Sequence, residues 1–303
     1  MVAARTSQPA GNAFVHVPGT GERVRTAVSM FVRSKPLGAF GGAVILILIV
    51  VAVFANVLSP YDPLAHQQVD ALQGPSWKHW SGTDQFGRDI FSRLLYGARI
   101  SLYVGVGATL LSILPAIALG ISTAYFRGPY DYGVQRVVDA VQSLPSLILI
   151  ITLVVILGTG IWNIIVALSF GRAIAGSRVI RGSSFQVMSS DYVLAARTLG
   201  ASDRRIMSRH VLPNVVAPAI VLGSLGFGQV ILAEASLSFL GLGIQPPAPS
   251  WGGMIASEGR SYMYAAPHML VMPAVALGLV VFGVNMFGDA LRDVLDPRLR
   301  GSS

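Results

Sequence analysis

Long apolar runs alternate with short polar segments along almost the whole chain. The runs extend over residues 36–61, 100–126, 140–157, 162–181, 215–242 and 267–287. A helix needs about 20 mostly apolar residues to cross the hydrocarbon core of a bilayer. The pattern therefore predicts an all-α polytopic membrane protein with six transmembrane helices.

The polar segments divide the chain into four parts. Residues 1–36 are polar and predict a cytoplasmic tail, and residues 37–98 hold the first transmembrane helix and an outer loop. Residues 99–293 hold the remaining transmembrane core with an Arg-rich loop at 189–213, and residues 294–303 form a second cytoplasmic tail.

Composition and charge narrow the class of protein. Charged residues make up 12% of the chain, whereas soluble domains average about 25%. There is no cysteine, which excludes disulfides and thiol chemistry. The net charge of +8 indicates basic cytoplasmic segments rather than nucleic-acid binding, because Lys and Arg gather on the inner side of membrane proteins. With both termini inside, few Lys and Arg fall in outer loops: Lys78, Arg88, Arg93, Arg99 and Arg260.

Ionisable residues inside the apolar runs are candidate functional groups, because burying a charge in a membrane is costly. Arg172 lies deeper in the fourth run than Arg178 and Arg181, and we expect it to face a protein or water-filled interior. Glu234 lies in the outer half of the fifth run. It is either a functional carboxylate or a structural anchor, paired with Arg172 or with a partner subunit.

Two further acidic positions have alternative interpretations. The outer segment around Asp84 and Arg88, with Asp89 and Arg93, fits i, i+4 ion pairs on a short interfacial helix. A metal or catalytic carboxylate pair is less favoured, because each acid has an Arg nearby to neutralise it. Asp139 is read as a carboxylate at a helix N-terminus rather than as a proton relay.

The 189–213 loop predicts a helix, a glycine turn and a second helix. Ser190 and Asp191 suit a helix N-terminus, and Gly200 can adopt the left-handed conformation that ends a helix. Ser202 and Asp203 restart a short helix, which the sequence predicts to end at Leu212–Pro213.

This loop resembles the cytoplasmic loop of bacterial ABC importer permeases, in which a Glu-Ala-Ala box precedes a Gly and then a Leu-Pro pair. The positions that fit are Ala195, Ala196, Gly200, Leu212 and Pro213. Leu194 stands where Glu is usual, so this position lacks the charge that an ion pair would need. His210 stands where Ile is general, and is similar to the His-x-Leu-Pro of the peptide/nickel branch.

Two outer segments carry the same resemblance. Residues 82–89 read Gly-Thr-Asp-Gln-Phe-Gly-Arg-Asp, similar to a signature in the first outer loop of peptide-importer permeases. Residues 237–247 read Leu-Ser-Phe-Leu-Gly-Leu-Gly-Ile-Gln-Pro-Pro, the most specific single match to that family. The resemblance covers nearly all of residues 30–298.

The resemblance implies a type I ABC importer permease fold and a role as the second, C-type permease of a heterodimer. It implies a homologous permease, two ATPase subunits and an extracytoplasmic substrate-binding protein as partners, in a bacterial inner membrane. Family cargoes include dipeptides, oligopeptides, nickel chelates and haem. The residues expected to couple the chain to the ATPase are Asp191, Ala195, Ala196, Gly200, Leu212 and Pro213.

The sequence contains no nucleotide-binding, zinc-binding or serine-nucleophile motif of the kinds considered below. Neither Lys35 nor Lys78 follows a phosphate-cradling Gly-x-x-x-x-Gly frame, and no His-Glu-x-x-His or Gly-x-Ser-x-Gly pattern occurs. We therefore expect no catalytic, cofactor or metal site, with ATP and Mg²⁺ bound by the partner ATPase subunits. The alternatives are a secondary transporter, which predicts paired ionisable residues at mid-span, and an intramembrane enzyme, which predicts a buried catalytic dyad.

Overall fold

A computed structural model describes residues 20–295, and the predicted tails at residues 1–19 and 296–303 lie outside this range. The chain divides into two compact units, Met1–Pro36 and Leu37–Ser303. The described part of the first unit contains the helix α1, Thr20–Ser34.

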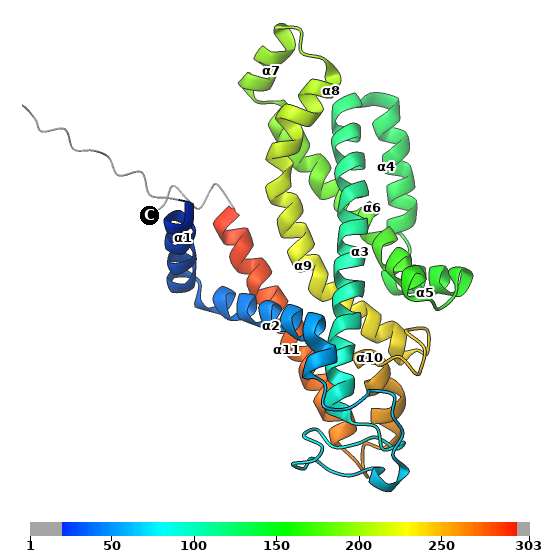
Figure 1. The fold of residues 1–303 in the computed structure, drawn as a ribbon. Coiled ribbons are helices and arrows are strands. Elements are labelled where there is room, and N and C mark those ends of the chain that lie inside the picture. The colour runs from blue at the N-terminus through cyan, green and yellow to red at the C-terminus, as the bar shows by residue number, and fades with distance from the viewer. Residues whose placement is uncertain (1–19, 296–303) are drawn as a thin grey trace, which may run out of the picture. The chain divides into compact units, whose positions relative to one another are not determined.

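The second unit is built from helices joined by short connections, apart from one long irregular segment after the first span (Figure 1). The described residues form no β-sheet, only an isolated bridge between Thr83 and Asp89. The α-helices are α2 Pro36–Leu58, α3 Ile90–Phe126, α4 Gly128–Gln142, α5 Ser146–Leu157, α6 Ile161–Met188, α7 Asp191–Thr198, α8 Asp203–Arg205, α9 Leu212–Phe239, α10 Trp251–Gly253 and α11 His268–Leu295. Three further turns are η1 Gln68–Asp70, η2 Ile206–Val211 and η3 Met254–Gly259, of which η2 and η3 are π-helical.

Five stretches are long and apolar enough to cross a membrane: α2, α3, α6, α11 and the continuous run from α8 through η2 to the end of α9. The pair α4 and α5 is bent by 90° and makes a sixth if it counts as one span. The expectation of an all-α protein with six spans is confirmed in this form.

The third span differs from the prediction. Residues 128–136, which the apolar pattern leaves between the second and third runs, lie in α4, and only α5 and the end of α4 fall within the predicted span at 140–157. Proline lacks the N–H that a helix needs and disfavours helical backbone at the preceding residue. Pro145 therefore separates the two helices and turns the chain sharply between them.

Helix α3 begins earlier than expected, at Ile90 rather than near residue 100. Asp89 precedes it with extended backbone, and its carboxylate accepts a hydrogen bond from the Ser92 N–H at 2.7 Å. This is an N-cap, which satisfies one of the free N–H groups at the start of the helix. The irregular segment between α2 and α3, which we call the outer segment after its predicted side of the membrane, therefore ends at residue 89.

Small residues let α3 and α6 pack closely. A Cβ atom added at Gly120 would lie 2.7 Å from Cβ of Ile180 and 2.8 Å from the carbonyl oxygen of Ser177. Ala116 and Ala124 are buried one turn to either side. Such small-residue spacing is the usual means of close helix contact in membranes, and it fixes α6 and the loop that follows it against α3.

Candidate functional site

The loop at residues 189–213 forms an exposed turn between α6 and α9, and we call it the elbow (Figure 1). Helix α7 ends where Gly200 takes a φ of +81°. The N–H of Gly200 donates to the carbonyl of Arg197, and the N–H of Ala201 donates to the carbonyl of Ala196, each at 3.0 Å. These two bonds make a Schellman motif. The predicted glycine turn is therefore present, and its conformation favours glycine.

One side of the elbow is anchored in a hydrophobic cluster. Val193 of α7 and Ile206 and Val211 of η2 are fully or almost fully buried. They pack with buried residues at the neighbouring ends of α3 and α6, among them Ile121 and Ile180. The hydroxyl of Tyr125 on α3 also donates to Asp203 at 2.5 Å. The elbow is thus held rigidly on the helices below it.

The opposite side of α7 is open. Ala195 is exposed, Ala196 is half-buried, and Leu199 next to the glycine turn is 87% exposed. Tyr192 and Leu194 are about half exposed. A short helix with a buried Val193 and an apolar exposed face suits a contact with another protein, because a monomer gains nothing from exposing a side chain such as Leu199.

The second helix of the elbow does not end at Leu212–Pro213, so that prediction is wrong. The helix continues from α8 through η2 into α9. The N–H of Leu212 bonds to the carbonyl of Met207, five residues back. A π-helical turn shifts the hydrogen-bond register and lets the helix pass Pro213, which has no N–H. Asn214 supports this turn by donating to the carbonyl of His210 at 2.7 Å.

The start of α7 agrees with the prediction in position but not in its cap. Ser190 has extended backbone and Asp191 is the first helical residue. The Ser190 hydroxyl donates to the carbonyl of Val187 instead of accepting from an N–H of α7. Asp191 is exposed in the first turn, where its charge suits the helix dipole.

Arg172 of α6 and Glu234 of α9 do not form a pair. The guanidinium of Arg172 donates from Nη1 to Oε1 of Gln229 at 2.9 Å, and its nitrogen Nε is buried without a partner among the described residues. Glu234 is 1% exposed and its Oε1 accepts from the Ser238 hydroxyl at 2.9 Å. The suggested ion pair between Arg172 and Glu234 is therefore wrong.

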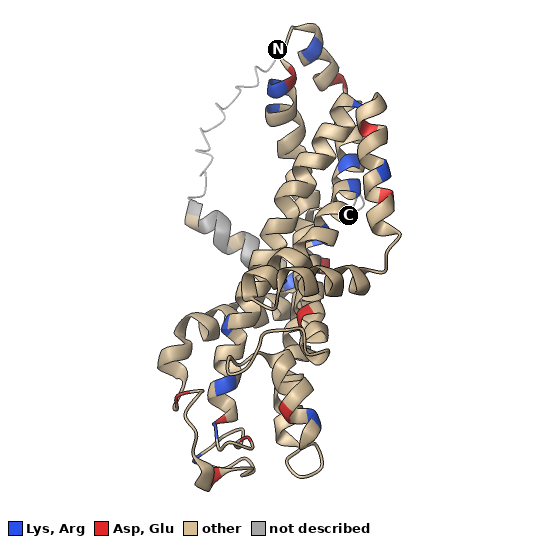
Figure 2. Ribbon diagram, turned by 90° about the vertical axis from the view of Figure 1, so that its right-hand side faces the viewer, with Lys and Arg blue, Asp and Glu red and all other residues tan. Residues whose placement is uncertain are grey.

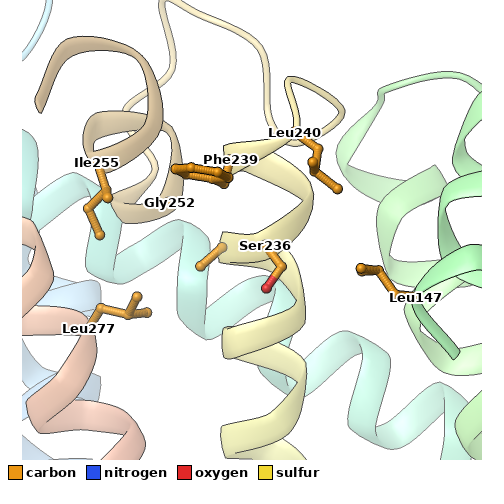
Figure 3. A pocket seen from close by; sticks show the side chains of 8 residues that line it. Leu147, Ser236, Phe239, Leu240, Gly252, Ile255 and Leu277 are labelled. Atoms are coloured by element: carbon orange, nitrogen blue, oxygen red, sulfur yellow. The ribbon is translucent and has the colours of Figure 1, made fainter. Parts of the chain in front are cut away.

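Two cavities flank the C-terminal half of α9. One, of about 330 Å³, has an almost wholly apolar lining from α5, α9, α10, η3 and α11 (Figure 3). The hydroxyl of Ser236 on its wall donates to the backbone of α9 itself. The other, of about 550 Å³, lies between the α4–α5 bend, α6 and α9, and Arg172 and Gln229 line it.

Helices α4 and α6 are joined by ion pairs. Arg181 donates from Nε to Asp131 at 2.8 Å, and Arg178 pairs with Asp139. Asp139 lies near the C-terminal end of α4, so its interpretation as a helix N-terminal carboxylate is wrong. Arg178 of the neighbouring helix α6 pairs with this carboxylate instead, in a partly exposed ion pair.

The outer segment holds a buried charge network. Asp84 accepts from Arg88 Nε at 2.6 Å, and Glu258 of η3 accepts from Arg88 at 2.6 Å and from Arg93 at 3.2 Å. Arg88 and Arg93 are both about 4% exposed. The predicted pairing of Asp84 with Arg88 is present, but in a turn rather than on a helix. Glu258 was not identified from the sequence. The available signal was that Glu258 and Arg260 are the only charged residues between Glu234 and Asp289 in the sequence.

A second part of the network surrounds His79, which sequence reasoning also missed. The His79 ring bonds to Asp89 at 2.9 Å between Nδ1 and Oδ1. Lys78 donates to Asp70 at 2.6 Å. This hydrogen bond lowers the pKa of the Asp70 carboxyl and raises the pKa of Lys78. The described residues contain no cluster of His and acidic side chains able to hold a metal ion. The buried acids of this segment, Asp70, Asp84 and Asp89, instead pair with Lys78, Arg88 and His79.

Charged residues of the second unit are most numerous toward its two ends and fewer between them (Figure 2). One end carries the elbow with Arg197, Arg204, Arg205 and Arg209, and the other carries the outer network. This distribution suits a protein whose middle lies in a hydrocarbon layer.

Comparison with known proteins identifies the family. Residues 116–301 match the model for the binding-protein-dependent transport system inner membrane component, and residues 27–75 match the N-terminal transmembrane domain of oligopeptide transport permease C. The chain is 40% identical over 270 residues to the glutathione transport system permease protein GsiD of Escherichia coli O6:K15:H31, with 89% of each chain covered. It is 42% identical over 260 residues to GsiD of Pectobacterium atrosepticum, with 86% of each chain covered.

The fold also matches a solved importer. An inward-facing structure of the MetNI methionine ABC transporter aligns with a TM-score of 0.57 at 17% identity, covering 68% of this chain and 98% of that chain. This likeness places the chain in the type I importer permease fold. The relatives are non-catalytic membrane components, which agrees with the expectation that the chain itself is not an enzyme. The chain belongs to the binding-protein-dependent transport system inner membrane component family and is a permease subunit of an ABC importer.

Proposed function

We propose that this permease forms half of a translocation pathway for small peptides, with a homologous permease as the other half and the elbow as its contact with the ATPase. The observation that carries the proposal is that the elbow is anchored on one side and exposed on the other. A buried cluster anchors one side of α7, and the other side presents Ala195 and Leu199 to solvent. A rigid, exposed apolar contact can pass motion of a docked partner directly into α6 and α9.

The pair Leu212–Pro213 has a different part in this mechanism from the one expected. The helix runs unbroken from Asp203 to Phe239. A displacement of the elbow by a docked partner is therefore transmitted along the whole of α9 as a rigid-body motion. The π-helical turn η2 is the place where this helix can change its hydrogen-bond register. Asp191, Ala196 and Gly200 shape α7, while Leu212 and Pro213 shape the turn.

The cargo that the relatives favour is a peptide of the glutathione type, ahead of nickel chelates or haem. The GsiD proteins are named for glutathione transport and cover most of this chain. We expect an extracytoplasmic binding protein to deliver the cargo. ATP and Mg²⁺ belong to the two ATPase subunits, and this chain holds no cofactor of its own.

Both termini and the elbow are proposed to face the cytoplasm of a bacterial inner membrane. The chain has no cysteine, so single cysteines can report sidedness. Leu199→Cys in the elbow and Trp77→Cys in the outer segment are matched reporters, because the two side chains are 87% and 98% exposed. In intact cells, a membrane-impermeant maleimide should label only Trp77→Cys. In inverted vesicles it should label Leu199→Cys, and added ATPase subunits should slow that reaction.

Labelling of Leu199→Cys from outside intact cells would contradict the orientation. An equal labelling rate with and without the ATPase subunits would contradict the docking role of the elbow. The cysteine at residue 77 faces the lumen of inverted vesicles, so its lack of labelling there controls for leaky or right-side-out vesicles.

A further inference from the structure

The three arginines of α6 differ in their partners. Arg178 and Arg181 pair with Asp139 and Asp131 of α4. Arg172 has no carboxylate within 4.0 Å among residues 20–295. Its Nη1 bonds to the neutral amide of Gln229, and its Nε is buried with no hydrogen-bond partner in the described part of the chain. Burying a guanidinium within a membrane costs free energy unless an anion or water compensates its charge. Among the residues that the structure describes, Arg172 lacks the carboxylate partner that Arg178 and Arg181 have.

The backbone opposite Arg172 is shaped to receive its side chain. A Cβ atom added at Gly226 of α9 would lie 1.8 Å from Nη2 of Arg172. Any larger residue at Gly226 would displace the guanidinium. The side chain is therefore held from two sides, by the backbone at Gly226 and by the side-chain amide oxygen of Gln229. A fixed fork of N–H donors is the geometry that recognises a carboxylate.

The cavity beside Arg172 is built mainly for hydrogen-bond acceptors. Its polar lining consists of Arg172, Gln229, Gln142 and Ser146, with no acidic residue, and the rest is apolar or glycine. The amide oxygen of Gln229 accepts from Arg172, and that of Gln142 accepts from Arg178 at 3.1 Å. Because arginine can only donate, these bonds fix both amides with their oxygens engaged. The N–H groups of the two amides remain to donate.

We propose that this cavity binds the carboxylate of a small solute in transit, with Arg172 as the anion-binding residue and Gln229 holding it in place. The volume of about 550 Å³ lies within the range of small-molecule sites. The apolar walls from α5 and α9 would enclose the remainder of a short peptide. This inference rests on the transport function proposed above and narrows its substrate class to solutes with a free carboxylate.

The site can be probed without measuring transport. Ala175 lines the same cavity and is exposed, so Ala175→Cys places a lone thiol of this chain beside Arg172. In the assembled transporter in nanodiscs, trialanine should slow maleimide labelling of this cysteine. Trialanine amide, which lacks the carboxylate, should slow it much less.

The Arg172→Gln variant should weaken protection by trialanine about tenfold or more, which is the scale of one charge-assisted hydrogen bond. Arg172→Lys should keep part of the protection, since it retains the charge but not the fork. Arg181→Gln, the same change two to three turns along α6, should leave protection intact. Leu199→Cys on the elbow should be insensitive to both peptides.

Equal protection by the acid and the amide, or unchanged protection in Arg172→Gln, would overturn the proposal. So would a loss of the two-permease complex in Arg172→Gln without protection in the parent protein, because Arg172 would then serve a carboxylate of the partner permease. Glutathione uptake by the same transporters reconstituted in liposomes separates this inference from the proposed function. Uptake without protection refutes only the site, and protection without uptake of any peptide refutes only the transport function.

Discussion

Replacing Gly200 with valine is expected to abolish uptake by the assembled transporter while the permease stays inserted in the membrane. Gly200 has a φ of +81° and open space around it, so a side chain there meets no neighbour. The cost is in the backbone, where the left-handed conformation disfavours L-residues by about 1–2 kcal/mol, with β-branched residues the least tolerated. Valine would break the Schellman motif and displace the exposed end of α7.

The measurement is uptake by reconstituted transporter together with ATPase activity, on preparations with equal amounts of the permease. Gly200→Asn should retain much of the activity, because asparagine tolerates the left-handed conformation better than other non-glycine residues. Gly241→Val is the matched control. Gly241 has a φ of +77° and open space, but it follows α9 at the opposite end from the elbow. Normal uptake by Gly200→Val would show that the shape of the elbow is not needed.

The apolar pattern was sufficient to predict the long membrane-spanning helices. A helix that crosses a bilayer needs a long run of apolar residues, and such a run is visible directly in the sequence. The pattern failed at the α4–α5 pair, where Pro145 ends one helix before the next begins and the two helices are bent by 90°. It also failed at Pro213, since no local signal tells whether a proline ends a helix or is absorbed by a π-helical turn. The outcome there depends on the anchoring of Ile206 and Val211 in the tertiary cluster.

The candidate site was likewise predictable only in part. The conformation of Gly200 followed from its residue type, whereas partners from distant segments could not be inferred. Arg172 was expected to need a polar neighbour, yet nothing in the sequence selects Gln229, 57 residues away, over Glu234. Glu258 meets Arg88 across 170 residues. Such pairs are set by which helix faces meet, and a single sequence does not reveal this.

Substituting Asp84 with alanine should cause the largest loss of stability in the outer segment. The Asp84 carboxylate is about 1% exposed and accepts hydrogen bonds from the N–H of Phe86, the N–H of Arg88 and Arg88 Nε. Its removal leaves Arg88 with only Glu258, which Arg93 shares. Breaking one partner of a buried ion pair costs about 3–5 kcal/mol. The variant should therefore melt at a lower temperature in detergent.

Asp62→Ala is the control for this change, because Asp62 lies in the same segment but is exposed and accepts only from the N–H of Leu64. Its melting temperature should stay close to that of the parent. The double variant Asp84→Ala, Arg88→Met should recover part of the loss, since it removes the uncompensated guanidinium along with its partner. Because Asp84, Arg88 and Glu258 tie the segment before α3 to the turn before α11, protease should also cut the outer segment of Asp84→Ala sooner. An unchanged melting temperature in Asp84→Ala would mean that packing alone holds these segments together.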